Sequence, residues 1–281
     1  MIVDAHLHLW DPARLRYPWL DGNALLDRPH LPDDFRRASE GCDVEAMIFV
    51  QCEAGPGQHL LETEWVASLA EQEPRIAAIV AWAPLEIGAS ARDSLERLTR
   101  HERVRGIRRI VQFEPDPAFC LQPDFIQGVK LLAEFGLTFD ICTDWSRLPY
   151  VVRFARAVPE VPMVLDHIGK PPIAAGLIEP WATHLRELAD LPHVWCKMSG
   201  VATEADHSNW NDAQLAPYID TAIQAFGYER LMFGGDWPVS TQAIDYRRWI
   251  ALLQRVLAGA SAADQDRFWR RNALHFYGLA H

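Results

Sequence analysis

The stretch Ile2-Val3-Asp4-Ala5-His6-Leu7-His8 opens the chain with an apolar run that ends in two histidines. Short, nearly continuous apolar runs are typical of strands that are buried on both faces, as in parallel sheets. Seven further runs of this kind follow. The sequence therefore predicts eight strands, at residues 2–6, 46–51, 76–83, 106–111, 137–142, 163–167, 194–198 and 231–235.

Longer segments with helical periodicity separate these strands, at residues 33–39, 60–71, 89–100, 124–134, 147–157, 181–189, 215–226, 246–257 and 262–273. Eight alternating strand and helix units with right-handed crossovers close naturally into a barrel. A chain of 281 residues is ordinary for one such domain. We therefore predict an α/β protein, a (β/α)8 TIM barrel that forms a single domain over residues 1–281. A doubly wound open sheet is the alternative.

The composition indicates which kinds of molecule the protein can bind. The net charge of −11 disfavours nucleic acid and anionic membrane surfaces, so a small-molecule substrate is expected. The sequence contains no apolar stretch of about 18 residues that could span a membrane, and because its first residues show the pattern of a strand and not that of a signal peptide, we expect no targeting signal. Five scattered cysteines without a CxxC pair indicate reduced thiols in a cytoplasmic protein. No feature of the sequence points to a particular oligomeric state.

The carboxyl ends of the predicted strands carry reactive side chains, which is where a barrel enzyme places its chemistry. His6 and His8 share one face of the first strand because side chains alternate with a period of two. His167 ends the sixth strand and Asp236 follows the eighth. Since the eighth strand neighbours the first in a closed barrel, we expect these four residues to form the catalytic centre.

Several further residues are weaker candidates for binding substrate, and each also has an ordinary structural interpretation. Lys197 lies within an apolar strand, where a charge is costly unless it is paired or faces the barrel mouth, and we expect the mouth. Arg108 and Arg109 alternate faces, and we take Arg109 as the inward one. The remaining candidates lie near strand ends: Glu53, Asp140, Trp10 and Trp237. Aromatic faces suit a sugar ring, although most of the eleven tryptophans are expected to pack in the core.

Four segments together resemble the amidohydrolase-related family, in its sugar-lactone hydrolase branch that includes L-fuconolactonases and L-rhamnono-lactonases. They are Asp4-Ala5-His6-Leu7-His8-Leu9-Trp10-Asp11, Leu165-Asp166-His167-Ile168-Gly169-Lys170-Pro171, Cys196-Lys197-Met198-Ser199-Gly200 and Phe233-Gly234-Gly235-Asp236-Trp237-Pro238. The resemblance covers essentially the whole chain. It implies a (β/α)8 barrel that hydrolyses an aldono-1,4- or 1,5-lactone, with Lys197 and Trp237 as substrate contacts.

The resemblance also bears on metal. Two-metal amidohydrolases use a carboxylated Lys or a Glu on the fourth strand and a His on the fifth, and neither is present in residues 106–111 or 137–142. We therefore expect no binuclear centre. His6, His8, His167 and Asp236 could hold a single divalent ion such as zinc. Lactonases of this branch also work without metal, so one ion or none is expected.

As a mechanism, we expect Asp236 to activate water as general base. His6, His8 or His167, together with Lys197, would polarise the lactone carbonyl. Two other reactions on the same scaffold are alternatives, a metal-dependent non-oxidative decarboxylation and a lactone isomerisation. A protein that binds sugar acids without turnover is the alternative outside enzymology.

Overall fold

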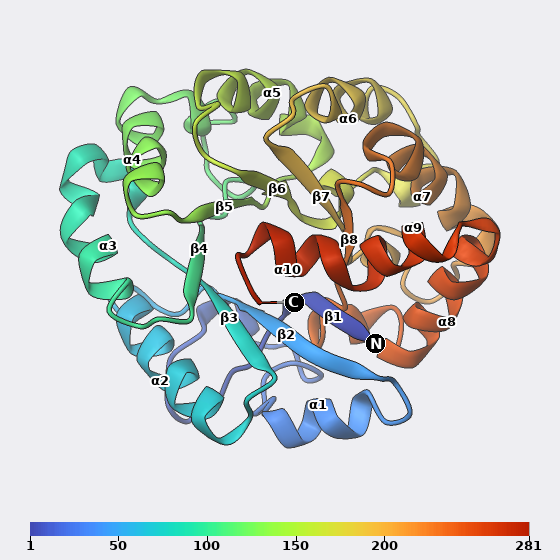
Figure 1. The fold of residues 1–281 in the computed structure, drawn as a ribbon, viewed down its shortest axis with the longest axis horizontal. Helices are drawn as coiled ribbons and strands as arrows, with labels where there is room; N and C mark the ends of the chain where they lie inside the picture. Colours follow the sequence, from blue (N-terminus) through green and yellow to red (C-terminus); the bar gives the residue numbers. More distant parts are fainter. Residues whose placement is uncertain (281) are drawn as a thin grey trace.

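The computed structural model describes residues 1–280, and eight parallel strands form a barrel at its centre (Figure 1). They follow one another around the sheet in chain order: β1 Ile2–Leu7, β2 Val44–Val50, β3 Ile76–Ala81, β4 Val104–Arg108, β5 Thr138–Ile141, β6 Met163–Leu165, β7 Val194–Met198 and β8 Leu231–Phe233. The predicted α/β barrel is confirmed. Several strands end two or three residues earlier than predicted, because the residues beyond them leave the sheet to form the site.

The barrel closes between β8 and β1 just beyond the last residue of β8. The Asp236 amide donates to the His6 carbonyl oxygen at 2.7 Å, and the His8 amide donates to the Trp237 carbonyl oxygen at 2.8 Å. These parallel-type bonds place the segment after β8 directly beside the end of β1. The first and eighth strands are therefore neighbours, as the sequence predicts.

Asp4 reinforces this junction from inside β1. Its Oδ1 accepts hydrogen bonds from the His6 amide at 3.0 Å and the Gly235 amide at 2.8 Å, and its Oδ2 accepts from the Tyr246 hydroxyl at 2.9 Å. Glycine is required at position 235, since a Cβ there would lie 2.2 Å from the Tyr246 ring. A buried carboxylate thus fixes the position of the strand end that carries His6.

Helices surround the barrel: α1 to α7 each connect one strand to the next, and α8 follows the last strand (Figure 1). The helix predicted over 89–100 is shorter in the structure, because residues 89–91 belong to a 3-10 segment, Leu85–Ala91, which is kinked at Gly88 with φ of 61°. The helices are α1 Pro32–Ala38, α2 His59–Gln72, α3 Arg92–Leu98, α4 Pro123–Glu134, α5 Leu148–Ala157, α6 Trp181–Ala189, α7 Asp212–Phe226 and α8 Tyr246–Val256.

The last part of the chain covers one end of the barrel. Instead of the single helix predicted over 262–273, it forms α9 Ala262–Asp266, a π-helical turn at Arg267–Arg271 and α10 Asn272–Phe276, which crosses the barrel axis in Figure 1. Leu274, Phe276 and Tyr277 pack against the apolar residues that fill the barrel interior. This seals the amino ends of the strands and leaves the carboxyl ends for the site.

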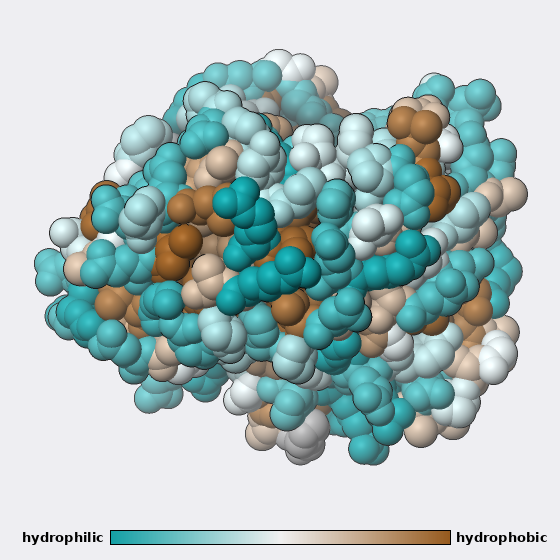
Figure 2. All heavy atoms as spheres, turned by 90° about the horizontal axis from the view of Figure 1, so that it is seen from above, coloured by the Kyte–Doolittle hydropathy of each residue, from teal (hydrophilic) through white to brown (hydrophobic). Residues whose placement is uncertain are grey.

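The face of the molecule drawn in Figure 2 is mostly hydrophilic, with small hydrophobic areas between the polar side chains. This agrees with helices whose apolar faces are turned toward the barrel. Among the described residues, no helix combines the length and the hydropathy that a membrane crossing requires.

Candidate active site

A cavity of about 420 Å³ opens at the carboxyl ends of the strands. It collects side chains from most of the loops that follow the strands, as expected for a barrel enzyme. Its lining residues are His8, Trp19, Cys52, Glu53, Arg108, Ile110, Phe113, Cys142, His167, Lys170, Thr203, Asp236 and Val239. Three of the four residues predicted to form the catalytic centre are in this list.

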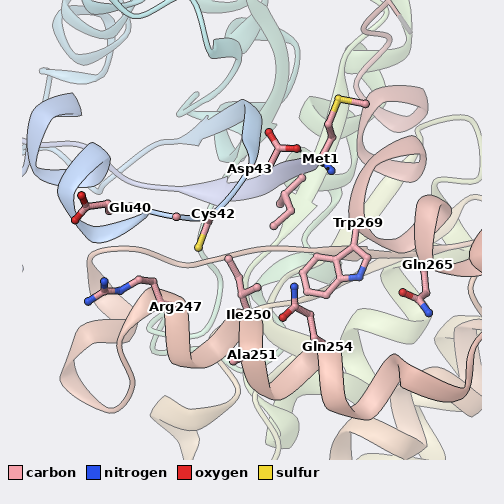
Figure 3. A pocket seen from close by; sticks show the side chains of 12 residues that line it. Met1, Glu40, Cys42, Asp43, Arg247, Ile250, Ala251, Gln254, Gln265 and Trp269 are labelled. Atoms are coloured by element: carbon pink, nitrogen blue, oxygen red, sulfur yellow. Dashed lines mark ion pairs between the residues drawn. The ribbon is translucent and has the colours of Figure 1, made fainter.

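A second cavity, of about 490 Å³, lies on another part of the molecule (Figure 3). Met1 and Asp43, which precede β1 and β2, form one side of it, and Arg247, Ile250 and Gln254 of α8 form the other. It therefore lies near the amino ends of these strands. None of the predicted site residues lines it.

His6 and His8 lie side by side at the end of β1, with their Nε2 atoms 3.1 Å apart. The Nδ1 of His8 lies 2.7 Å from the Val50 carbonyl oxygen. A carbonyl oxygen can only accept, so this nitrogen carries the ring proton, and Nε2 of the neutral ring keeps a lone pair. Asp236 Oδ1 lies 3.4 Å from that Nε2 and 3.8 Å from the Nε2 of His6. The predicted pair and its carboxylate are therefore together.

His167 completes the group. Its ring centroid lies 4.5 Å from that of His6, and its Nδ1 is 2.9 Å from the Ser199 hydroxyl. Gly200 follows β7 at this point with φ of 59°, and a Cβ there would lie 2.6 Å from His167 Nδ1 and 3.0 Å from Asp236 Oδ2. The structure thus brings His6, His8, His167 and Asp236 together, and the absence of a side chain at Gly200 makes room for them.

Burial sets the charge states of this group. It lowers the pKa values of His6, His8 and His167, because the charged imidazolium loses hydration. Burial acts to raise the pKa of Asp236, but His167, His8 and Lys170 outweigh it and hold that pKa below its ordinary value. At neutral pH the centre therefore consists of neutral imidazoles around an ionised carboxylate, which can accept a proton.

Lys197 does not face the barrel mouth as predicted. It is fully buried inside the barrel, in ion pairs with Asp140 and with Asp166 Oδ1, the latter at 3.1 Å. Its Nζ also lies 3.3 Å from His6 Nδ1. Asp140 likewise lies in the interior, where its Oδ2 accepts a hydrogen bond from Tyr277 at 2.9 Å. Neither residue lines the cavity, since both are fully buried, and each charge is stabilised there by the other.

Arg108, rather than Arg109, points into the barrel. Its Nη1 lies 3.3 Å from His6 Nε2 and 3.4 Å from Asp166 Oδ2, and its Nη2 donates to the Gln51 carbonyl oxygen at 2.5 Å. Arg109 turns outward to Glu86 and Glu114, at 3.2 and 2.6 Å. The register explains the difference, since Arg108 pairs with Asp140 of β5, whose side chain faces the interior.

Trp10 and Trp237, predicted to contact substrate, are buried and do not line the cavity. The Trp10 indole donates to the carbonyl oxygens of Leu26 and Arg28, so it anchors the long loop after β1. That loop instead presents Trp19, whose indole donates to the Cys52 carbonyl oxygen at 2.7 Å. Trp19 was not predicted, because it lies in the irregular stretch between β1 and α1, where no periodic pattern indicates which side chains face the site.

Positive φ angles identify the site independently. Among the described residues, five other than glycine have positive φ: Glu53, His167, Ile168, Lys170 and Asp236. Four of them line the cavity, Ile168 being the exception. Each such residue costs about 1–2 kcal/mol, and strain of this kind concentrates at functional sites. Glu53, predicted from the sequence, and Lys170, which was not, therefore belong to the site.

The donor atoms of the centre fit one zinc ion. Ligand atoms of His6, His167 and Asp236 lie within 4.8 Å of one another, and His8 Nε2 adds a lone pair 3.4 Å from Asp236. In a tetrahedral zinc site, ligand atoms lie about 3.4 Å apart. The bond from His8 Nδ1 to Val50 orients the ring as the outer hydrogen bond of a zinc-bound histidine does.

Comparisons with known proteins agree with this geometry. The family model described as amidohydrolase matches residues 3–279. An L-fucono-1,5-lactonase of Burkholderia multivorans is 36% identical over 99% of this chain and 96% of its own. A 4-sulfomuconolactone hydrolase of Rhizobium radiobacter is 37% identical over 84% of this chain and 75% of its own.

A crystal structure of an amidohydrolase from Burkholderia multivorans with bound zinc superposes with a TM-score of 0.90, at 35% identity and with both chains covered completely. The match to the family model spans nearly the whole chain, and three of the four segments on which the resemblance rests supply residues that line the cavity: His8, His167, Lys170 and Asp236. This chain belongs to the amidohydrolase family.

Proposed function

We propose that the protein hydrolyses a sugar lactone to the corresponding aldonic acid. The observation that carries this proposal is the ionised Asp236 carboxylate, held among three neutral imidazoles in the wall of a cavity of about 420 Å³. Opening a lactone needs an activated water, a polarised carbonyl and a proton for the departing alkoxide. Two relatives that are named for lactone hydrolysis support the same reaction.

In the proposed reaction, Asp236 takes a proton from water as the water oxygen attacks the lactone carbonyl carbon. The carbonyl π electrons move to the oxygen and give a tetrahedral oxyanion. On collapse the ring C–O bond breaks, and the departing alkoxide takes the proton back from Asp236. The product acid then ionises in solution, and the enzyme returns to its starting charge state.

Of the two histidines that line the cavity, we assign His167 as the donor to the carbonyl oxygen. The His8 proton is engaged with Val50, so its Nε2 has no proton to give. His167 Nδ1 lies 2.9 Å from the Ser199 hydroxyl, and we assign the hydroxyl as the donor in this bond, which places the ring proton on Nε2 and makes that nitrogen a donor. Lys197 acts through His6, which it helps to orient, and does not contact the substrate.

A bound metal ion would have one role in this reaction. A zinc ion held by His6, His8 and Asp236 would act as a Lewis acid on the lactone carbonyl, and His167 would join them as a ligand only with its ring proton on Nδ1, in which case zinc would take its place in polarising the carbonyl. The proton transfers described above are carried out by residues of the chain.

Substrate contacts follow from the cavity wall. We propose that Glu53 accepts hydrogen bonds from sugar hydroxyls, because its carboxylate lines the cavity and forms no ion pair among the described residues. Trp19 and Phe113, 41% and 77% exposed, lie at the same cavity and offer aromatic faces to the apolar face of a sugar ring. These two aromatic residues replace Trp10 and Trp237 in that role.

We further propose that residues 1–281 act as one catalytic domain, because β1 and the segment after β8 contribute to one centre. A cytoplasmic location is proposed from the five cysteines, all of which are free thiols in the structure.

The function is tested by a pH-indicator screen of L-fucono-, L-rhamnono- and other aldonolactones, as 1,4- and 1,5-rings. Acid release from sugar lactones is the expected result. Loss of CO2 from an aromatic acid with no effect on lactones would favour the decarboxylase. Migration of the ring between the 1,5- and 1,4-positions, followed by NMR, would favour the isomerase. Aldonate binding without turnover of any lactone would favour the binding protein.

A further inference from the structure

The chain contains three lysines, and the structure gives each a different environment. Lys130 is exposed and pairs with Glu160 at 3.4 Å. Lys197 is fully buried and pairs with two aspartates. Lys170 lines the cavity and is partly exposed, yet among the described residues it forms no ion pair. The site therefore keeps one uncompensated ammonium close to the reacting groups.

The backbone holds Lys170 there at a cost. Four consecutive residues, from His167 to Lys170, have positive φ between 46° and 73°. Outside glycine such conformations are unfavourable by about 1–2 kcal/mol per residue. The Lys170 amide donates to the His167 carbonyl oxygen at 2.9 Å, so the turn that presents His167 also presents Lys170. The two side chains are thus positioned as a unit.

The charges around Lys170 limit what it can bind. Its positive charge lowers the pKa of Asp236, so the two groups lie in each other's field. Asp236 and Glu53 add two carboxylates to the same cavity wall. Both carboxylates would repel a substrate that is already an anion, whereas a neutral polyhydroxy lactone carries no charge to be repelled. Arg108, the other cation in the cavity wall, pairs with Asp166 at 3.4 Å, whereas Lys170 has no ion pair within residues 1–280 and is available for the negative charge that the reaction creates.

We propose that the Lys170 ammonium binds the carbonyl oxygen of a neutral lactone as that oxygen becomes anionic, and then holds the carboxylate of the product. This inference rests on the proposed lactone hydrolysis. It adds a residue that stabilises the transition state, beside the hydrogen bond from His167. It also specifies the substrate class as uncharged lactones.

The decisive variant is Lys170→Met. It removes the charge but keeps an unbranched side chain, which must adopt the same positive φ as lysine at this position. On a neutral aldonolactone we expect kcat to fall by about 100-fold to 1000-fold, as on removal of an oxyanion donor, with KM changed by only a few-fold. Inhibition by the product aldonate should weaken by at least about 10-fold. Lys170→Arg should restore much of the product binding, and Lys130→Met should leave both quantities unchanged.

Two results would overturn the inference. One is Lys170→Met with normal kcat and normal product inhibition. The other is a change confined to KM for lactones that carry a carboxylate or sulfonate, which would make Lys170 a receptor for substrate charge. Calorimetric titration of L-fuconate onto the unmodified protein and Lys170→Met needs no turnover. It therefore tests the ammonium even if the unmodified protein opens no lactone.

Discussion

The Lys197 ammonium and the Asp166 carboxylate lie 3.1 Å apart inside the barrel, and His6 Nδ1 is within 3.3 Å of the first and 3.2 Å of the second. This contact fixes the ring of His6 from the side opposite the cavity. All three side chains are fully buried. The orientation of a central imidazole therefore depends on a charged network that no substrate touches.

Removing the cation of this network should be costly. In Lys197→Met, Asp140 and Asp166 are left in the interior without their shared partner, and we expect a loss of about 3–5 kcal/mol in the free energy of unfolding, measured in urea. Adding Asp140→Asn should recover part of that loss, because one uncompensated charge disappears with it. Lys130→Met serves as the control, with a change below about 0.5 kcal/mol. Additive losses in the double variant would contradict the argument.

Asp236→Asn tests the assigned base. The amide keeps the shape but cannot take a proton from water, so we expect kcat for lactone opening to fall by about 100-fold to 10,000-fold. The circular dichroism spectrum should be unchanged. Activity near the unmodified level would remove Asp236 from this role.

Substitution of Gly200 tests whether the catalytic group needs the room that the absent side chain leaves, and substitution of Gly176 is the matched control. Alanine there would place Cβ 2.6 Å from His167 Nδ1, so we expect kcat to fall by at least about 100-fold. Gly176 has φ of 66°, close to the 59° of Gly200, but a Cβ added there has no atom within 4 Å. Gly176→Ala should therefore show the cost in stability of the backbone conformation without the loss of activity. Equal activities of the two variants would exclude the steric explanation.

Stability should fall as pH rises, because of Glu62. This residue of α2 is buried, with Oε1 accepting from the Cys52 amide at 3.1 Å, and burial raises its pKa to about 8 from an ordinary 4.5. A raised pKa means that the folded state binds the proton more tightly. This contribution to the free energy of unfolding is fully present below pH 4.5 and is lost as pH rises to about 8. The total loss is at most on the order of 5 kcal/mol. Glu62→Gln should flatten this part of the urea-unfolding profile, and an unchanged profile would contradict the assignment.

Zinc binding should stop at one ion per chain. After zinc loading and gel filtration, elemental analysis should give no more than one equivalent, and His8→Ala should lower the affinity by at least about 10-fold. Cys142, Asp166 and His167 could in principle hold another ion, but Asp166 is already engaged with Lys197. Cys142→Ser should therefore retain the metal. Two equivalents would contradict this expectation. Chelator treatment followed by assay then shows whether activity needs the ion.

The strands and the catalytic centre were predictable because both follow short-range rules. Buried parallel strands appear as continuous apolar runs, and a period of two places His6 and His8 on one face. Asp236 then follows from the neighbourhood of the first and last strands in a closed barrel.

The misplaced residues depend on information that a single strand does not contain. Alternation shows that one of Arg108 and Arg109 faces inward, but only the register with β5 selects Arg108. Lys197 looked like a residue of the mouth because its two aspartate partners lie on other strands. The positions of Trp19 and Lys170 in the site depend on irregular segments of backbone, whose φ angles are set by tertiary contacts.

The segment after α9 connects the end of the chain to the centre of the enzyme. Tyr277 donates to Asp140, Asp140 pairs with Lys197, and Lys197 contacts His6. During synthesis on the ribosome, residue 277 emerges after every strand of the barrel. The nascent chain can therefore form all eight strands and still lack the last support of its catalytic histidine, so full activity should arise only after translation has passed Tyr277.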